Sequence, residues 1–307
     1  MHQYDQIRSG NSGFKIGIDL GGTKTEIVTL DENRRQVFRK RVKTPAHDYG
    51  AILDLITDLV GQAGDGLPEL VPVGIGTPGA ISPGSGMLRN SNTSCLNGKP
   101  LQTDLEDRLK RVVKLQNDAN CFSLSEALIG AGQGFMTVFG VIVGTGTGGG
   151  LVVNGQLLTG PNAITGEWGH NPLPWKKESD GSPRCYCGKG GCIETYISGS
   201  GLAKNYRLKT GVDLSSEAIV QAALRGDRSC VQAMDIYYDQ FARSLAHVIN
   251  IIDPDAIILG GGMSNIADIY RQLPDRLESW VFSDTLVTPV LPAQHGDASG
   301  VLGAAML

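Results

Sequence analysis

Two distant segments of the chain repeat one pattern: a hydrophobic strand, a glycine-rich loop and a second hydrophobic strand. The first covers residues 14–30, with Gly21 and Gly22 in its loop, and the second covers residues 136–155, with glycines throughout 144–150. Because a strand follows each loop, both are hairpins. This excludes the Walker phosphate loop and the dinucleotide fingerprint, which lead into a helix. The repetition predicts a duplicated domain whose two copies offer hairpins to one ligand.

The glycine loops carry groups suited to binding phosphate. Glycine lets backbone N–H groups approach phosphate oxygens, and Thr23 and Lys24 add donors at the first tip. Asp19 ends the preceding strand, where a carboxylate can hold Mg²⁺ through water. For the first loop alone, an ordinary glycine hairpin is an equally good interpretation.

A third glycine run, residues 260–262, follows a hydrophobic strand at 256–259, and we expect a helix to begin near Ser264. Ligands of α/β proteins bind at such carboxyl ends of strands. Three loops of this kind favour a nucleotide held between two lobes.

One histidine and three cysteines form the most distinctive local motif of the chain. Two carboxylates, Glu167 and Glu194, bracket this set and could present hydrogen-bonding groups to a polar ligand. Imidazole and thiolates are the ligands of tetrahedral Zn²⁺, and four protein ligands make a closed, structural site. A disulfide to Cys192 and chance core cysteines are the alternatives; we find no signal peptide, which disfavours an oxidising compartment. The four candidate ligands are His170, Cys185, Cys187 and Cys192.

Composition narrows the class of protein. The chain has 307 residues, enough for one large or two ordinary domains, and its 41% hydrophobic content is that of a soluble globular protein. A net charge of -4 gives no general attraction to nucleic acid or anionic membranes, and no apolar run reaches the ~20 residues of a membrane helix. We therefore expect a cytoplasmic protein without nucleic-acid or membrane partners. Residues 1–13 are polar and aperiodic, and we expect a flexible extension.

Asp118 is the candidate general base. It follows a predicted strand at residues 111–115 and precedes a predicted helix at 121–127. An N-cap role alone would explain an aspartate here, although Asn117 and Asn120 could also cap the helix. A carboxylate at such a strand end is also what a kinase needs to accept the proton of an attacking hydroxyl.

Together these motifs resemble the ROK family of bacterial sugar kinases, which has the actin-like, hexokinase-like ATPase fold. The resemblance extends from about residue 14 to 307. Residues 166–175 and 185–189 look most like bacterial fructokinases that also accept mannose, and the N-acetylglucosamine kinases are the alternative. The motifs that carry the resemblance are residues 19–24, 76–79, 117–120, 144–150, 166–170, 185–194 and 259–262.

The resemblance implies an α/β fold of two RNase H-like lobes with a zinc-binding insertion in the large lobe. The small lobe would span residues 14–115 and include a C-terminal helix at 292–307. The large lobe would span residues 116–291 and carry the zinc site and helices of the dimer-forming type. Many relatives are dimers, so we expect a homodimer. A sugar-responsive regulator is a third possibility, but it normally needs an N-terminal helix-turn-helix domain.

The implied activity is ATP-dependent phosphorylation of a hexose, fructose or mannose, to the 6-phosphate, with Mg²⁺ and structural Zn²⁺. Asp118 would be the base, and Asp19 would lie near Mg²⁺. Cys95 stands where many members carry an aromatic residue, which could widen the sugar pocket. The implied sugar-binding residues are Gly79, Asn92, Asn117, Asp118, Glu167, His170 and Glu194. The implied nucleotide-binding residues are Gly21, Gly22, Thr23, Lys24, Thr145, Gly146, Gly148, Gly149, Gly261 and Gly262.

Overall fold

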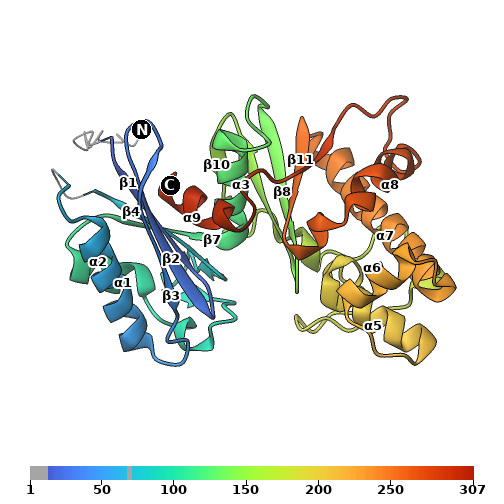
Figure 1. The fold of residues 1–307 in the computed structure, drawn as a ribbon, viewed down its shortest axis with the longest axis horizontal. Coiled ribbons are helices and arrows are strands. Elements are labelled where there is room, and N and C mark those ends of the chain that lie inside the picture. Colours follow the sequence, from blue (N-terminus) through green and yellow to red (C-terminus); the bar gives the residue numbers. More distant parts are fainter. Residues whose placement is uncertain (1–12, 68–70) are drawn as a thin grey trace. The chain divides into compact units, whose positions relative to one another are not determined.

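The computed structural model describes residues 13–67 and 71–307. The predicted N-terminal extension, apart from Gly13, lies outside the described residues. The chain divides into two compact units, each with its own sheet (Figure 1). Unit 1 comprises Met1–Asp118 and Val301–Leu307, and unit 2 comprises Ala119–Gly300.

The sheet of unit 1 has the strand order β3-β2-β1-β4-β7. The first three strands form an antiparallel meander, whereas β4 and β7 run parallel to β1. The parallel strands therefore end at one edge, where Asp19 pairs with Gly76 and Thr77 pairs with Asn117. The strands are β1 (Lys15–Leu20), β2 (Lys24–Leu30), β3 (Gln36–Lys43), β4 (Val73–Thr77) and β7 (Val113–Asn117).

Helices cover both faces of this sheet (Figure 1). The apolar faces of α1 (Tyr49–Ala63) and α2 (Leu101–Leu109) share one buried cluster with β1. On the opposite face, Val301 and Ala305 of α9 (Ser299–Ala305) pack on β2. A short hairpin of β5 (Ala80–Ile81) and β6 (Leu88–Arg89) and a 3-10 turn (Ser94–Leu96) complete the unit.

The sheet of unit 2 repeats this plan in the order β10-β9-β8-β11-β12. Here β8 and β9 form the second glycine hairpin, and β11 and β12 run parallel to β8. The recurrence of the same strand order and directions confirms the predicted duplicated α/β architecture. The strands are β8 (Thr137–Val143), β9 (Thr147–Val153), β10 (Gln156–Leu158), β11 (Ala256–Gly260) and β12 (Val290–Pro292).

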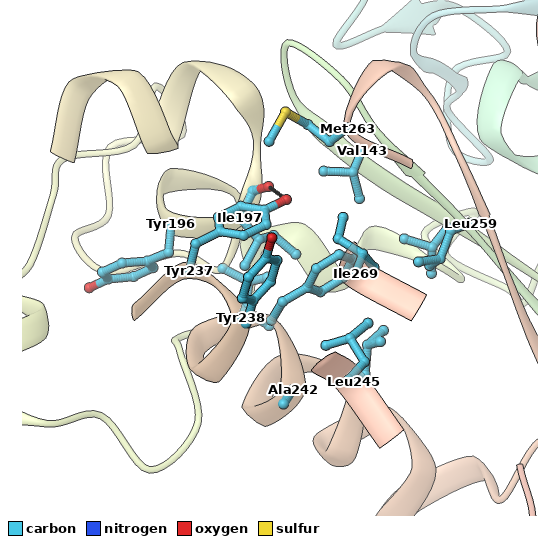
Figure 2. Packing of buried hydrophobic residues seen from close by; sticks show 14 of the residues in the cluster. Val143, Tyr196, Ile197, Tyr237, Tyr238, Ala242, Leu245, Leu259, Met263 and Ile269 are labelled. Atoms are coloured by element: carbon cyan, nitrogen blue, oxygen red, sulfur yellow. Dashed lines mark hydrogen bonds between the residues drawn. The ribbon is translucent and has the colours of Figure 1, made fainter. Parts of the chain in front are cut away.

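The long helix α7 (Arg228–Ile252) provides much of the core of unit 2. Figure 2 shows Tyr237 and Tyr238 packed among aliphatic side chains, with the Tyr237 hydroxyl donating to the carbonyl of Ile197 at 2.9 Å. The other helices are α3 (Asp118–Ile129), α4 (Glu194–Ile197), α5 (Gly199–Thr210), α6 (Ser216–Leu224) and α8 (Ala267–Glu278), with 3-10 turns at Glu167–His170, Glu178–Asp180, Gly262–Asn265 and Gly296–Ala298.

Two boundaries differ from the predictions. The helix expected near Ser264 is a 3-10 turn at that point, and α8 begins only at Ala267, because Gly261 and Ile266 take non-helical backbone angles. The C-terminal helix is shorter than 292–307, because Val290–Pro292 is a strand of the second sheet and a 3-10 turn precedes α9. Among the described residues, no helix is long and apolar enough to cross a membrane.

Candidate active site and metal centre

In unit 1, Asp19 and Asp118 lie near one another at the carboxyl edge of the parallel strands. Asp19 belongs to β1, and Asp118 directly follows β7 as the first residue of α3. Burial raises the pKa of Asp19 to about 7, and the negative charges of Asp118 and Glu26 add to the effect while Arg41 opposes it. Two carboxylates kept close in a buried edge favour a bound cation.

The first glycine hairpin is held in shape by backbone contacts. Gly21 N donates to the Lys24 carbonyl at 3.0 Å, and the Thr44 hydroxyl donates to the Gly21 carbonyl at 2.8 Å. The side chains of Thr23 and Lys24 are exposed. The tip therefore offers its donors outward, as expected for a loop that contacts phosphate.

One predicted sugar-site residue of unit 1, Asn92, lies beside this hairpin. A side chain at Gly22 would touch Thr93 and Asn92, so those residues border the loop. The Thr93 hydroxyl is buried and has no hydrogen-bond partner among the described residues. Farther along the sheet edge, the Asn117 amide donates to the Gly79 carbonyl at 3.1 Å and so fixes the turn after β4.

In unit 2, the four predicted metal ligands converge. Their ligand atoms all lie within 4.8 Å of one another. Cys185 Sγ is 3.7 Å from His170 Nδ1, and Cys187 Sγ is 3.6 Å from Cys192 Sγ. A tetrahedral ion with bonds of about 2.3 Å separates its ligands by roughly 3.7 Å, so the set fits Zn²⁺. The cysteines are free thiols, which excludes the disulfide alternative in this structure.

A short chain reversal positions these ligands. An isolated β-bridge between Pro172 and Cys192 joins the segment after His170 to the third cysteine. A second bridge, between Arg184 and Gly190, pairs the two sides of the cysteine turn. Cys185 N donates to the Lys189 carbonyl at 2.9 Å, which closes the turn between the cysteines. The cysteine segment of residues 185–192, the metal-ligand knot, has little apolar core, since Cys187 and its neighbours are exposed. A bound metal would supply the cohesion that such a segment lacks.

The metal-ligand knot packs directly on the second glycine loop. Glu194 Oε2 accepts a hydrogen bond from Thr147 N at 3.1 Å, and its Oε1 lies 3.8 Å from Cys185 Sγ. Trp168 Nε1 donates to the Gly148 carbonyl at 3.1 Å. The Thr147 hydroxyl is buried without a partner among the described residues. The loop that we expect to face phosphate therefore depends on the metal-ligand knot for its shape.

In unit 2, Tyr186 lies near His170, Glu167 and Glu194, which the motif analysis assigned to the sugar. His170 turns Nδ1 toward Cys185, while its Nε2 lies 3.0 Å from the Tyr186 hydroxyl. Glu167 and Glu194 are near enough to that hydroxyl to act on its pKa. Partial burial and then these two negative charges raise the pKa of Tyr186 to about 12.

The third glycine loop opens onto a cavity of about 710 Å³ in unit 2. Gly262 and Met263 line it on one side, and Tyr238 of α7 lies on another. The cavity mixes apolar walls with acidic and basic side chains, which suits a flat polar ring system. The sequence did not predict that α6, α7 and α8 line this cavity, because their residues follow the pattern of ordinary amphipathic helices.

Comparison with known proteins establishes the family. The model of the ROK family matches residues 15–307. The chain belongs to the ROK family. It is 41% identical to the N-acetyl-D-glucosamine kinase of Pectobacterium atrosepticum over 300 residues, which cover 95% of this chain and 97% of that protein.

Two solved ROK structures share the fold. The ROK hexokinase from Thermus thermophilus superposes with a TM-score of 0.86 at 27% identity, covering 95% of this chain and 97% of that one. The ROK family glucokinase from Streptomyces griseus, in complex with glucose and AMPPNP, gives 0.73 at 29% identity, covering 95% and 98%. The predicted fold and family are confirmed. The 41% identity is to an N-acetyl-D-glucosamine kinase, so it supports the N-acetylglucosamine kinase alternative and not the special likeness to fructokinases.

Sequence reasoning missed three residues that shape the site. Thr147 lies in the second glycine loop, Trp168 donates to the Gly148 carbonyl of that loop, and Tyr186 contacts Nε2 of His170. All three stand inside recognised motifs, so their positions were a usable signal. The contact of Thr147 with Glu194 joins residues far apart in the sequence and had none.

Proposed function

We propose that this protein is an ATP-dependent sugar kinase that transfers a phosphoryl group to a hexose hydroxyl. The observation that carries the proposal is the close approach of Asp19 and Asp118 at the carboxyl edge of the first sheet. Phosphoryl transfer needs positioning and charge neutralisation more than covalent help from the protein. A cation-holding carboxylate beside a second carboxylate supplies both needs.

In this proposal the two aspartates have different tasks. Asp118 accepts the proton of the attacking sugar hydroxyl, and Asp19 orients Mg²⁺, which supplies charge neutralisation on the phosphates when bound. Lys24 and the backbone N–H groups around Gly22 contact phosphate oxygens. The hydroxyls of Thr93 and Thr147 at the two glycine loops are buried and have no hydrogen-bond partner within residues 13–67 and 71–307. This supports ligand binding there, because buried polar groups normally have partners.

The residues of unit 2 would bind the sugar and the nucleoside. Glu167, His170 and Glu194 present oxygens and a ring nitrogen suited to sugar hydroxyls. His170 would also hold structural Zn²⁺ with the three cysteines, whose donor types and spacing fit that ion. The cavity beside Gly262 would take the nucleoside. The remaining proposed contacts of this unit are Thr145, Gly146, Gly148, Gly149 and Gly261, and in unit 1 Gly21, Thr23, Gly79, Asn92 and Asn117.

For the substrate we propose N-acetyl-D-glucosamine, phosphorylated at its 6-hydroxyl. The support is the 41% identity to an N-acetyl-D-glucosamine kinase over nearly the full length of both chains. Fructose, with mannose, is the second candidate, because residues 166–175 and 185–189 resemble the motifs of fructokinases. Cys95 approaches the Ala46 carbonyl at 3.2 Å, and its small side chain would leave room for a bulkier sugar.

The decisive experiment is a coupled ADP-release assay on N-acetylglucosamine, fructose, mannose and glucose. An Asp118→Asn variant is run alongside, and its kcat is expected to fall by about 10²–10⁴-fold with an unchanged melting temperature. The highest kcat/KM on N-acetylglucosamine would support the first substrate, and the highest on fructose the second. No turnover of any sugar by folded, zinc-loaded protein would exclude the hexose-kinase proposal.

The proposed homodimer has a separate test. Light scattering coupled to size exclusion should give a mass near twice the 32.5 kDa of one chain. A monomeric mass at micromolar concentration would contradict it.

A further inference from the structure

The hydroxyl of Tyr186 occupies a hydrogen-bonding position on His170 that the proposed function assigns to the sugar. The Tyr186 oxygen lies 3.0 Å from His170 Nε2, and the two rings meet edge to face with centroids 5.2 Å apart. Tyr186 stands between the candidate ligands Cys185 and Cys187, so its backbone is held by the knot. The position of this backbone therefore places the hydroxyl beside one nitrogen, His170 Nε2.

The chemistry of the imidazole decides the direction of this hydrogen bond. His170 Nδ1 faces Cys185 Sγ at 3.7 Å within the candidate metal set. A ring that binds a metal through Nδ1 carries its hydrogen on Nε2. With a metal on Nδ1, the Nε2–H group would donate to the Tyr186 oxygen. A sugar hydroxyl at His170 would need the same single N–H group.

Two carboxylates that the proposed function assigns to the sugar lie in the neighbourhood of the Tyr186 hydroxyl. Glu167 and Glu194 both act electrostatically on it. Yet the side chain as a whole is 81% exposed. Because it has little packing to lose, rotation of the ring away from His170 costs little beyond the one hydrogen bond.

We propose that Tyr186 is an internal competitor for the sugar: its hydroxyl holds His170 Nε2–H in the sugar-free protein, and a sugar hydroxyl displaces it. The inference rests on the proposed function. It makes Tyr186 a residue that sets sugar affinity without taking part in phosphoryl transfer. The tyrosine also keeps the N–H paired when no sugar is bound, so the cost of displacement applies to every sugar that uses this nitrogen.

The test compares wild type with Tyr186→Phe, which keeps the ring and removes the competing oxygen. A neutral hydrogen bond has a net worth equivalent to about 2- to 10-fold in affinity. We therefore expect the KM for sugar, and the Kd from calorimetry without nucleotide, to fall by about that factor. The kcat and the zinc content by metal analysis should not change. An unchanged or raised Kd would overturn the proposal, and loss of zinc would do the same by giving the hydroxyl a structural role.

A matched control separates this effect from general loss of a tyrosine hydroxyl. Tyr206 contacts Ser229 and Cys230 on α7, and Tyr206→Phe should leave sugar KM and Kd unchanged. A comparable fall in the control would overturn the assignment to His170. Failure of the proposed function is distinguishable, because wild type would then turn over no sugar in the first place.

A structure with sugar bound gives an independent readout. The Tyr186 oxygen should lie more than about 3.5 Å from His170 Nε2, beyond hydrogen-bonding range, with a sugar oxygen in its place. Retention of the Tyr186 contact in the complex would overturn the proposal.

Discussion

At the residue scale, the acidity of Asp19 depends strongly on its surroundings. Free aspartate has a pKa near 3.9. Here burial, followed by the charges of Asp118 and Glu26, raises the pKa to about 7. Glu26 itself is paired with Arg39 and Arg41 on the neighbouring strand. A proton or a bound cation would reduce the electrostatic repulsion among these carboxylates.

This raised pKa predicts a specific pH dependence of stability. Because the folded pKa lies above the unfolded one, the stabilising contribution is full below about pH 4 and is lost as pH rises through about 7. Without Mg²⁺, the melting temperature of wild type relative to Asp19→Asn should therefore fall between pH 4 and pH 8. Millimolar Mg²⁺ should reduce the fall. A difference that stays constant with pH would contradict the assignment.

Asp180 illustrates the opposite case, a buried carboxylate with strong partners. Burial alone would raise its pKa, but hydrogen bonds from Arg243 and Gln240 outweigh that cost and lower it. The Arg243 side chain is 0% exposed and lies 3.0 Å from Asp180. Arg243 also pairs with Asp239 at 3.0 Å, so loss of the Asp180 charge would leave the buried guanidinium with one counterion of two.

We therefore predict that Asp180→Asn lowers the free energy of unfolding by about 3 kcal/mol, the lower end for a broken buried pair, because Asp239 still faces Arg243. The matched control is Asp213→Asn, which breaks the exposed pair with Arg207 and should cost about 1 kcal/mol or less. Urea denaturation of both variants measures the difference. Equal effects would show that the buried pair adds no more than a surface pair.

At the scale of elements, side-chain hydrogen bonds couple the metal-ligand knot to the second glycine loop. Glu194 links Cys185 to Thr147, and Trp168 holds the Gly148 carbonyl. Loss of a metal ligand should therefore affect both the residues proposed to bind the sugar and the loop proposed to face the nucleotide.

Cys187→Ser tests this coupling. It should abolish stoichiometric zinc, lower the melting temperature by several degrees, and raise KM for both sugar and ATP. Cys230→Ser, which alters a buried cysteine on α7 outside the metal set, should retain zinc and both KM values. A Cys187 variant with altered sugar KM but normal ATP KM would disprove the coupling between the metal-ligand knot and the second glycine loop.

At the scale of the whole molecule, the C-terminal residues return to the N-terminal sheet. Residues 301–307 belong to unit 1, and α9 packs on the face of the sheet opposite α1. The approach is close enough that a side chain at Gly74 of β4 would overlap the Ala304 carbonyl. Only glycine at this position lets the helix dock on the strand.

Gly74→Ala should therefore strongly destabilise the protein, by several kcal/mol, because α9 must shift or the strand must distort. The control is Gly61→Ala in α1, where no atom lies within 4 Å of the added methyl group. That change should stabilise the helix by about 1 kcal/mol. Thermal melts of the two variants should move in opposite directions.

The sequence by itself determined the local units and their chemistry. Alternating strands and glycine hairpins, the histidine–cysteine spacing and Asp118 after a strand were all readable, because each depends on residues close together in the chain. Glu126 is an exception within such a local unit. In the sequence it looks like an ordinary helix residue, but its side chain is buried and accepts hydrogen bonds from Ala131, Gln294 and Ser299.

The tertiary structure alone decided which distant groups meet. The nearness of Asp19 to Asp118, the bond from Thr147 to Glu194, the Tyr186 contact on His170 and the cavity beside Gly262 each join separate parts of the sequence. Such contacts depend on how strands order themselves in a sheet and on which way side chains leave it. Sequence patterns specify the faces of an element, whereas packing between elements selects the partners that those faces find.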